Sequence, residues 1–277
     1  MGNLDQAGKA ARFAEMHRRD GIFVLPNCWD AASACVLADA GFPAIATTSG
    51  GCAFSLGYCD GENIPRNEML GAIGRIARAV SIPVSADMEA GYGEPPEAVA
   101  ETVRLAIEAG AIGVNIEDSD KSGPRRLIDF DLAVERVEAA VAAARDSGMD
   151  IVINARTDGY MMGNDDAVFE ETVRRANAYL GAGAGCVFAM GARDGALIAR
   201  LAPAIDGPLN ILAGPGTPPV PELGEMGVKR VTVGGNIAKA ALTLVRRAAD
   251  ELAGPGTYGF AEGAFSQAEI HRIMRGE

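Results

Sequence analysis

The feature that most constrains this chain is an alternation of short apolar runs with helical patterns, repeated eight times along 277 residues. Each unit spans roughly 25–30 residues, the size of one strand-and-helix unit of a (β/α)8 barrel. We expect strands at 22–26, 43–48, 82–87, 113–117, 151–156, 186–189, 209–212 and 230–233. The sequence therefore predicts an α/β fold, a (β/α)8 TIM barrel. An open doubly wound sheet is the alternative, but its usual six or so strands would leave two units over.

Two segments lie outside this repeat. An amphipathic helix is expected at residues 3–19, and a polar, Gly-bearing tail leads to a last helix at 266–275. No domain linker and no low-complexity tract interrupts the sequence between them. We therefore expect a single barrel domain over 1–277, with the barrel at about 21–253 and a C-terminal extension at 254–277.

Composition narrows the range of partners. The net charge is −12 and no basic run occurs, which argues against nucleic acid and anionic membrane surfaces as partners. The five cysteines show no C-x-x-C spacing, as expected for reduced thiols in a cytoplasm. No apolar run reaches the roughly 18 residues of a membrane-spanning helix. We expect a soluble, cytoplasmic protein whose partner is a small molecule.

Acidic residues follow several of the predicted strands at the end where barrel enzymes carry their active sites. Asp87 and Glu89 close one strand, and alternate residues of a strand project to the same side. Glu117 and Asp118 close the next strand, and Asp60 lies in the loop of the preceding unit. An all-oxygen set without histidine suits a hard ion, best Mg²⁺, with Mn²⁺ as the alternative. Alternatively, Glu117 and Asp118 cap a helix or pair with Arg156.

Other polar residues at the strand ends leave two interpretations open. Ser49-Gly50-Gly51 is either a backbone cradle for an anion or an ordinary tight turn. Arg156 is either a structural counter-ion or a clamp for a substrate carboxylate. Gly234-Gly235-Asn236 is either a phosphate site or a plain helix start. Both histidines lie in the terminal helices, and no lysine closes a predicted strand, which disfavours a histidine base and a Schiff-base aldolase.

Six motifs in a fixed order resemble the isocitrate lyase/phosphoenolpyruvate mutase superfamily over residues 20–250. They are Pro26-Asn27-Cys28-Trp29-Asp30-Ala31, Thr48-Ser49-Gly50-Gly51, Tyr58-Cys59-Asp60-Gly61-Glu62, Ala86-Asp87-Met88-Glu89-Ala90-Gly91-Tyr92-Gly93, Ile116-Glu117-Asp118 and Asn154-Ala155-Arg156-Thr157-Asp158. The resemblance implies a Mg²⁺-stabilised, enolpyruvate-like intermediate. It implies that Asp87 binds the ion directly and that Asp60, Glu89 and Glu117 hold its waters. The substrate-binding residues that it implies are Ser49, Gly50, Gly51, Arg156, Asn210 and Trp29.

The loop after Glu117 departs from the motifs of this superfamily. Its lyases carry Lys-(Lys/Arg)-Cys-Gly-His there, whereas this chain has Ser119-Asp120-Lys121-Ser122-Gly123-Pro124-Arg125-Arg126, without Cys or His. This difference speaks against isocitrate and methylisocitrate cleavage. The phosphonate branch has a Lys-x-Asn loop and a histidine after the sixth strand, where this chain has Met190.

These observations predict a Mg²⁺-dependent carbon–carbon lyase that decarboxylates or cleaves a small 2-oxo or 2-hydroxy carboxylic acid. We expect Arg156, Glu117, Lys121, Arg125 and Arg126 to be catalytic, the last three on a cationic loop that closes over the substrate. The alternatives are phosphorus–carbon chemistry on phosphonopyruvate and non-catalytic binding of a 2-oxo acid. The resemblance also implies a homodimer or homotetramer, in which the last helix packs on a neighbouring subunit.

Overall fold

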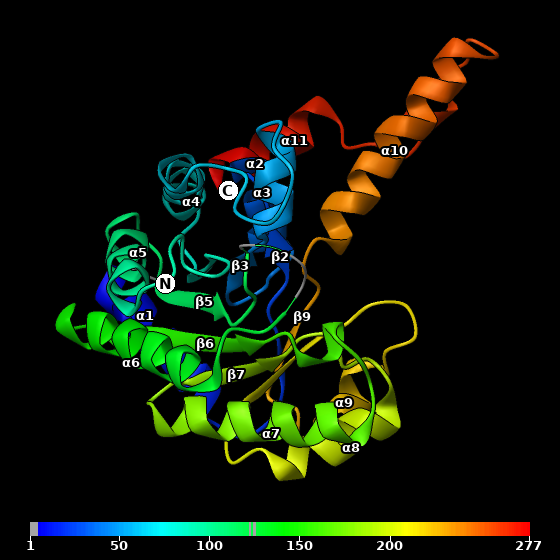
Figure 1. The fold of residues 1–277 in the computed structure, drawn as a ribbon. Helices are drawn as coiled ribbons and strands as arrows, with labels where there is room; N and C mark the ends of the chain where they lie inside the picture. Colours follow the sequence, from blue (N-terminus) through cyan, green and yellow to red (C-terminus); the bar gives the residue numbers. More distant parts are fainter. Residues whose placement is uncertain (1–4, 122, 124–125) are drawn as a thin grey trace.

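The computed structural model describes residues 5–121, 123 and 126–277, and this part of the chain contains one sheet of nine parallel strands (Figure 1). The order across the sheet is β1-β9-β8-β7-β6-β5-β4-β3-β2. The strands are β1 (Phe23–Val24), β2 (Asn27–Cys28), β3 (Ile45–Thr47), β4 (Val84–Asp87), β5 (Gly113–Glu117), β6 (Val152–Thr157), β7 (Cys186–Ala189), β8 (Leu209–Leu212) and β9 (Arg230–Thr232).

The sheet curls until its two ends meet in the first strand of the chain. β1 pairs with β9 and β2 pairs with β3, and only Leu25 and Pro26 separate β1 from β2. Hydrogen bonding continues through this break: the Leu25 amide donates to Val231 O at 2.7 Å, and the Ala46 amide donates to Pro26 O at 2.9 Å. The first predicted strand is therefore split in two and extends to Cys28. The closure fits a TIM-barrel-like α/β fold and not an open sheet.

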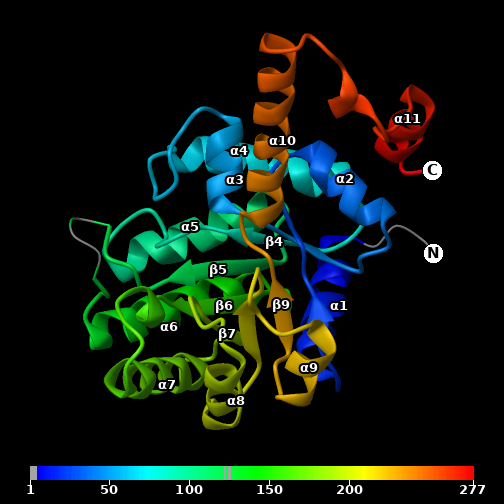
Figure 2. The same ribbon diagram turned by 90° about the vertical axis from the view of Figure 1, so that its right-hand side faces the viewer.

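Helices surround the sheet and connect successive strands (Figure 2). They are α1 (Gln6–Arg18), α2 (Ala31–Asp39), α3 (Ser49–Ser55), α4 (Arg66–Ala79), α5 (Pro96–Glu108), α6 (Phe130–Asp146), α7 (Asp166–Gly181), α8 (Gly195–Ala204), α9 (Val220–Glu225), α10 (Asn236–Ala253) and α11 (Gln267–Arg275). Aspartates begin several of them: Asp30 accepts a hydrogen bond from the Ser33 amide at 2.7 Å, and Asp165 and Asp194 cap α7 and α8 in the same way. Such caps satisfy backbone donors that the first helical turn leaves free. Within the described residues, no helix is long and apolar enough to cross a bilayer.

The C-terminal segment leaves the barrel and returns to it. α10 stands away from the other helices, and α11 lies beside α2 (Figures 1 and 2). Arg272 of α11 forms a two-pronged ion pair with Asp39, with distances of 2.6 and 2.8 Å. The last helix thus packs on its own barrel in this structure, and the element that extends outward is α10.

Helix α1 closes the amino-terminal ends of the strands. Its Phe13 and His17 form an edge-to-face cluster with Phe23 of β1, with ring centroids 4.8 to 6.5 Å apart. Gly113 leaves room for this plug, because a Cβ there would lie 2.8 Å from the Phe13 ring. The polar end of the barrel is therefore the opposite one, where the strands finish.

His17 gives this plug a predictable dependence on pH. Burial, followed by the positive charge of Arg230, lowers the pKa of His17 to about 3. An unfolded histidine has a pKa near 6.5, so between about pH 6.5 and 3 only the unfolded chain takes up this proton, and stability falls as the pH falls. Between pH 7 and 4.5, we expect the free energy of unfolding to fall by about 2 kcal/mol less in His17→Leu than in wild type.

Urea denaturation at the two pH values measures this difference. The matched control is His271→Leu on α11, where the histidine is exposed. If the free energy of unfolding falls by the same amount between pH 7 and 4.5 in wild type and in His17→Leu, the expected effect is contradicted.

Candidate active site

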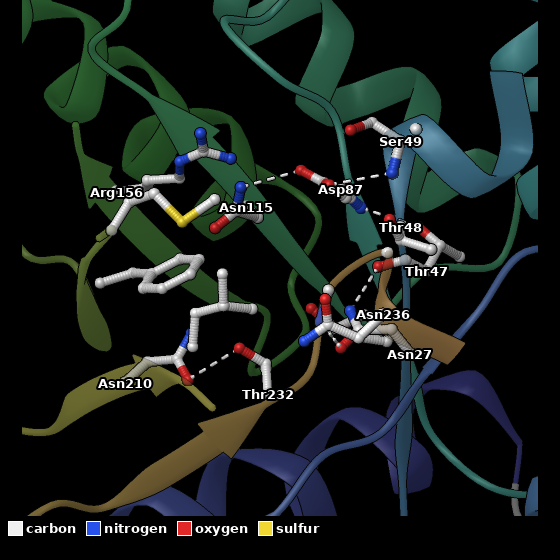
Figure 3. Close-up of a pocket in the computed structure, with 18 of the residues that line it drawn as sticks. Asn27, Thr47, Thr48, Ser49, Asp87, Asn115, Arg156, Asn210, Thr232 and Asn236 are labelled. Atoms are coloured by element: carbon white, nitrogen blue, oxygen red, sulfur yellow. Dashed lines mark hydrogen bonds between the residues drawn. The ribbon is translucent and has the colours of Figure 1, made fainter. Parts of the chain in front are cut away.

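A cavity of about 240 Å³ lies among the carboxyl-terminal ends of the strands, and every strand from β2 to β9 contributes to its wall. This volume is below the roughly 300–1,000 Å³ of pockets for drug-sized ligands, so the cavity suits a small molecule. Figure 3 shows Asp87 and Ser49 on one side of it and Arg156 and Asn210 on the other.

The Asp87 carboxylate accepts hydrogen bonds from two elements of the barrel, β5 and α3. The Asn115 side-chain amide donates to Asp87 Oδ1 at 2.9 Å, and the Ser49 backbone amide donates to Oδ2 at 3.0 Å (Figure 3). Asn154 in turn donates to Asn115 Oδ1 at 2.8 Å. Parallel pairing of Asp87 with Asn115 and of Asn115 with Asn154 aligns this row. The carboxylate is thereby held at the cavity wall in a defined orientation.

The backbone of Glu89 is not the extended strand that the sequence predicted. β4 ends at Asp87, and Glu89 has a φ of 51°, in the left-handed region that non-glycine residues rarely adopt. The alternation of side chains along a strand therefore does not place Glu89 beside Asp87. Its backbone is held because Glu89 O accepts a hydrogen bond from the Glu117 amide at 2.8 Å. Such strain concentrates at functional sites.

Glu117 and Arg156 are neighbours because β5 and β6 pair in register at these two residues. Arg156 Nη1 lies 2.7 Å from Glu117 Oε2, and its Nε donates to Asp158 Oδ1 at 2.5 Å. Lys121 Nζ lies 2.5 Å from Glu117 Oε1 and 3.5 Å from Glu89 Oε2. Arg156 is thus a counter-ion to two acids, and it also lines the cavity.

The carboxylates of this region are costly to charge together. Burial, assisted by the charges of Asp87 and Asp60, raises the pKa of Glu89 to about 8. Burial also raises the pKa of Glu117, although Arg156 and Lys121 oppose the shift. A positive charge bound between Glu89 and Glu117, in addition to Lys121, would therefore be stabilised.

The four predicted metal ligands, Asp87, Asp60, Glu89 and Glu117, form no closed cage. In the described part of the chain, no three His, Cys, Asp or Glu side chains group closely enough to hold a metal by themselves. Mg²⁺ needs fewer protein ligands than that, because it keeps several waters. An all-oxygen donor set, an oriented Asp87 and mutually repelling acids fit such an ion. Asp118 serves another purpose: Tyr179 donates to its Oδ2 at 2.8 Å, and Arg175 lies 3.2 Å away.

Ser49-Gly50-Gly51 forms the first turn of α3 and not an irregular turn. Ser49 and Gly50 line the cavity, and the Ser49 hydroxyl donates to Asp60 Oδ1 at 3.1 Å. Gly51 and Trp29 are not among the lining residues. A Cβ on Gly51 would lie 2.7 Å from Trp29 Cβ, so these two predicted substrate-binding residues pack behind the wall.

The cationic residues of the loop predicted to close over the substrate differ in what they contact. Lys121 reaches Glu117, whereas Arg126 pairs with Asp120 at 2.5 Å and its side chain is largely exposed. Neither residue is among those that line the cavity. Arg125 lies outside the described residues. Gly234-Gly235-Asn236 lines the cavity where α10 begins.

Three cationic residues of the cavity wall were not predicted as site residues from the sequence: Arg193, Arg230 and Lys239. Arg230 stands at the start of its predicted strand, Arg193 in a loop and Lys239 within a helix, so a search for strand ends does not find them. Together with Arg156 they line the same cavity as Asp60 and Asp87. The cavity therefore offers an anion a favourable environment within a protein of net charge −12.

Comparisons with known proteins agree with this geometry. The model of the phosphoenolpyruvate phosphomutase family matches residues 13–253. A solved structure from Burkholderia cenocepacia J2315, described as a lyase/mutase, is 43% identical with a TM-score of 0.90, covering 96% of this chain and 95% of that one. The solved structure of 2,3-dimethylmalate lyase, a PEP mutase/isocitrate lyase superfamily member, is 29% identical with a TM-score of 0.84, covering 96% and 94%.

A named relative is the 2-methylisocitrate lyase of Escherichia coli (strain K12). It is 33% identical over 214 residues, which cover 75% of this chain and 70% of that enzyme. The family match spans most of the chain and includes the strands that carry Asp87, Glu117 and Arg156. This chain therefore belongs to the phosphoenolpyruvate phosphomutase family, within the PEP mutase/isocitrate lyase superfamily, whose named members among its homologues include lyases.

Proposed function

We propose that this protein is a Mg²⁺-dependent carbon–carbon lyase that cleaves a small 2-oxo or 2-hydroxy carboxylic acid. The observation that carries the proposal is a fixed Asp87 in a small cavity that four cationic side chains line. Asp87 would hold the ion directly, and Asp60, Glu89 and Glu117 would hold its waters. When bound, a divalent ion supplies Lewis-acid stabilisation of charge that develops on the 2-oxygen.

The side chains of this chain would divide the remaining tasks. Arg156 and the Ser49 hydroxyl face the cavity and would bind the substrate carboxylate next to the reacting bond. Lys121 contacts Glu117 and lies near Glu89, so it would move a proton to or from the leaving group. Its place between two acids substitutes for the missing cysteine and histidine of the superfamily loop.

Phosphorus–carbon chemistry remains the second candidate, favoured by the name of the matching family. One product analysis separates the candidates: the protein with Mg²⁺ is incubated with a panel of 2-oxo and 2-hydroxy di-acids and with phosphonopyruvate. Mass spectrometry reports carbon–carbon cleavage, and ³¹P NMR reports a changed phosphorus bond. A new ³¹P signal with no carbon–carbon product would overturn the lyase proposal, and binding without any product would indicate a 2-oxo-acid binding protein.

The metal site gives the first mutational prediction. Asp87→Asn and EDTA should each abolish turnover, because each removes the direct ion contact. Asn115→Leu should weaken Mg²⁺ binding about 10–100-fold, because it removes a group that orients a ligand. Isothermal titration with Mg²⁺ measures the affinity, and Asp166→Asn, on the exposed surface of α7, is the control. Full activity in EDTA would contradict the metal-dependent mechanism.

Lys121 and Arg126 provide a matched pair within one loop. Lys121→Met should lower kcat on the order of 10²-fold or more, the usual contribution of a positioned acid or base. Arg126→Met should leave kcat within about twofold, because it loses only an exposed ion pair. Steady-state kinetics from pH 6 to 9 test both variants. Equal effects of the two substitutions would refute a specific role for Lys121.

The outward helix α10 supports a proposed homo-oligomer. Leu242, Val245 and Leu252 recur on one face of it and are exposed, which suits burial against a second copy of this chain. The double variant Leu242→Asp/Val245→Asp should therefore lower the mass measured by light scattering. Arg247→Asp, which helical spacing places roughly opposite this face, serves as the control. The same mass for wild type and the apolar-face variant would exclude α10 as the interface.

A further inference from the structure

Arg136 of α6 is a buried arginine whose partners are backbone carbonyls and not acids. It is only 2% exposed. Its Nη1 donates to Gly93 O at 2.7 Å and to Glu94 O, and its Nη2 donates to Ala90 O. No carboxylate of the described residues lies within ion-pair distance of it, although Glu62 and Glu94 favour its charge from farther away. An arginine is rarely buried without an acidic partner, so these three contacts need an explanation.

The three carbonyls belong to the turn at 89–94, which joins β4 to α5 directly after Asp87. This turn is irregular, so neither a helix nor a sheet supplies donors for its carbonyls. Two of its residues, Glu89 and Tyr92, have φ values of 51° and 57°, in the left-handed region that favours glycine. Such conformations persist only where the surrounding structure over-determines them.

Arg136 restrains this turn more than any other side chain that the structure describes. Glu89 O accepts a hydrogen bond from the Glu117 amide at 2.8 Å, and Gly91 O accepts one from the Thr102 hydroxyl at 2.7 Å. Each of these two donors satisfies one carbonyl, whereas the Arg136 guanidinium satisfies three. Without Arg136, the left-handed backbone of the turn would lose most of what holds it from outside.

The direction of the Glu89 side chain depends on this turn. Its Oε1 is fully buried and has no hydrogen-bond partner among the described residues, and its Oε2 lies 3.5 Å from Lys121 Nζ. The Tyr92 hydroxyl of the same turn is also buried without a partner there. Buried polar groups are normally hydrogen-bonded, and waters held by an ion at Asp87 would satisfy both of these.

We propose that Arg136 is a positioning residue, which holds the turn at 89–94 so that the Glu89 carboxylate is directed toward the ion at Asp87. This inference rests on the proposed function and extends its metal site to a residue of an outer helix. Arg136 is not among the residues that line the cavity, so it acts through Glu89 and not on the substrate.

A double-mutant cycle on Mg²⁺ affinity tests whether Arg136 acts through Glu89. Isothermal titration with Mg²⁺ measures this affinity without turnover. Arg136→Met should weaken Mg²⁺ binding about tenfold, the lower end of the range for a residue that orients a ligand of a metal site. Glu89→Gln should weaken it at least as much. The double variant should bind Mg²⁺ within about twofold of Glu89→Gln, because residues that act as a unit are not additive. Losses that add in full would overturn the proposal.

Arg175→Met is the matched control. Arg175 is a buried arginine of α7 that pairs with Asp118 and Glu171 and does not contact the turn. Its loss should leave Mg²⁺ affinity within about twofold, even where it lowers stability. Equal losses of affinity in Arg136→Met and Arg175→Met would overturn the positioning role. Wild type that binds no Mg²⁺ would overturn the proposed function itself, whereas binding that Arg136→Met leaves unchanged would overturn only the role of Arg136.

Hydrogen exchange of the metal-free protein reports on the turn directly. The amides of Gly91 and Tyr92 donate to Met88 O and to Glu62 Oε1, both at 2.9 Å. In Arg136→Met these amides should exchange on the order of tenfold faster, while those of α8 keep their wild-type rates. Unchanged exchange in the turn would contradict the proposal.

Arg136→Lys provides a second variant that keeps the positive charge. Lysine lacks the planar fork of donors that lets one guanidinium contact three carbonyls, so both Mg²⁺ affinity and exchange should lie between those of wild type and Arg136→Met. If Arg136→Met does not fold, the cycle with Glu89→Gln is measured on Arg136→Lys. Failure of both variants to fold would show that Arg136 maintains the barrel itself and would overturn the proposal.

Discussion

Closure of the sheet at residues 23–28 is the constraint on which the rest of the structure depends. Because β1 pairs with β9 and β2 pairs with β3, side chains from strands far apart in the sequence face one interior. α1 fills the amino-terminal end of this interior with aromatic rings. The polar side chains are left at the opposite end, where eight of the strands surround one small cavity.

Two of the buried arginines each join a pair of acids. Arg156 joins Glu117 and Asp158 at the cavity, while Arg175 joins Asp118 and Glu171 on its outer side. A buried charge is costly unless another charge and hydrogen bonds compensate it. Both arginines meet that condition within the chain. Among the described residues Arg230 has no salt bridge, and its buried Nε and Nη1 have no hydrogen-bond partner.

The sequence predicted the architecture and the acidic character of the site for physical reasons. Strand and helix periodicities are local, and parallel strands finish at one edge, so Asp87, Glu117 and Arg156 could be expected together. Glu89 could not be placed by the same rule, because its positive φ breaks the alternation of the strand. α3 was missed because Ser49-Gly50-Gly51 has the composition of a turn.

Arg230 was missed for a different reason. Catalytic residues of a barrel are expected at the carboxyl-terminal ends of strands, and this residue lies at the start of a strand, where barrel residues usually serve stability. Its long side chain nevertheless borders the cavity, which only the three-dimensional arrangement reveals. Lys121 likewise depends on a loop path that no periodicity specifies, and its contact with Glu117 follows from that path.

The proposed lyase mechanism requires a divalent ion at Asp87. A crystal of the protein soaked with Mn²⁺ and measured at a wavelength where manganese scatters anomalously tests it most directly. We expect an anomalous peak next to a carboxylate oxygen of Asp87, on the side that faces Glu89 and Glu117. A peak only elsewhere on the molecule, or no peak at saturating Mn²⁺, would contradict it.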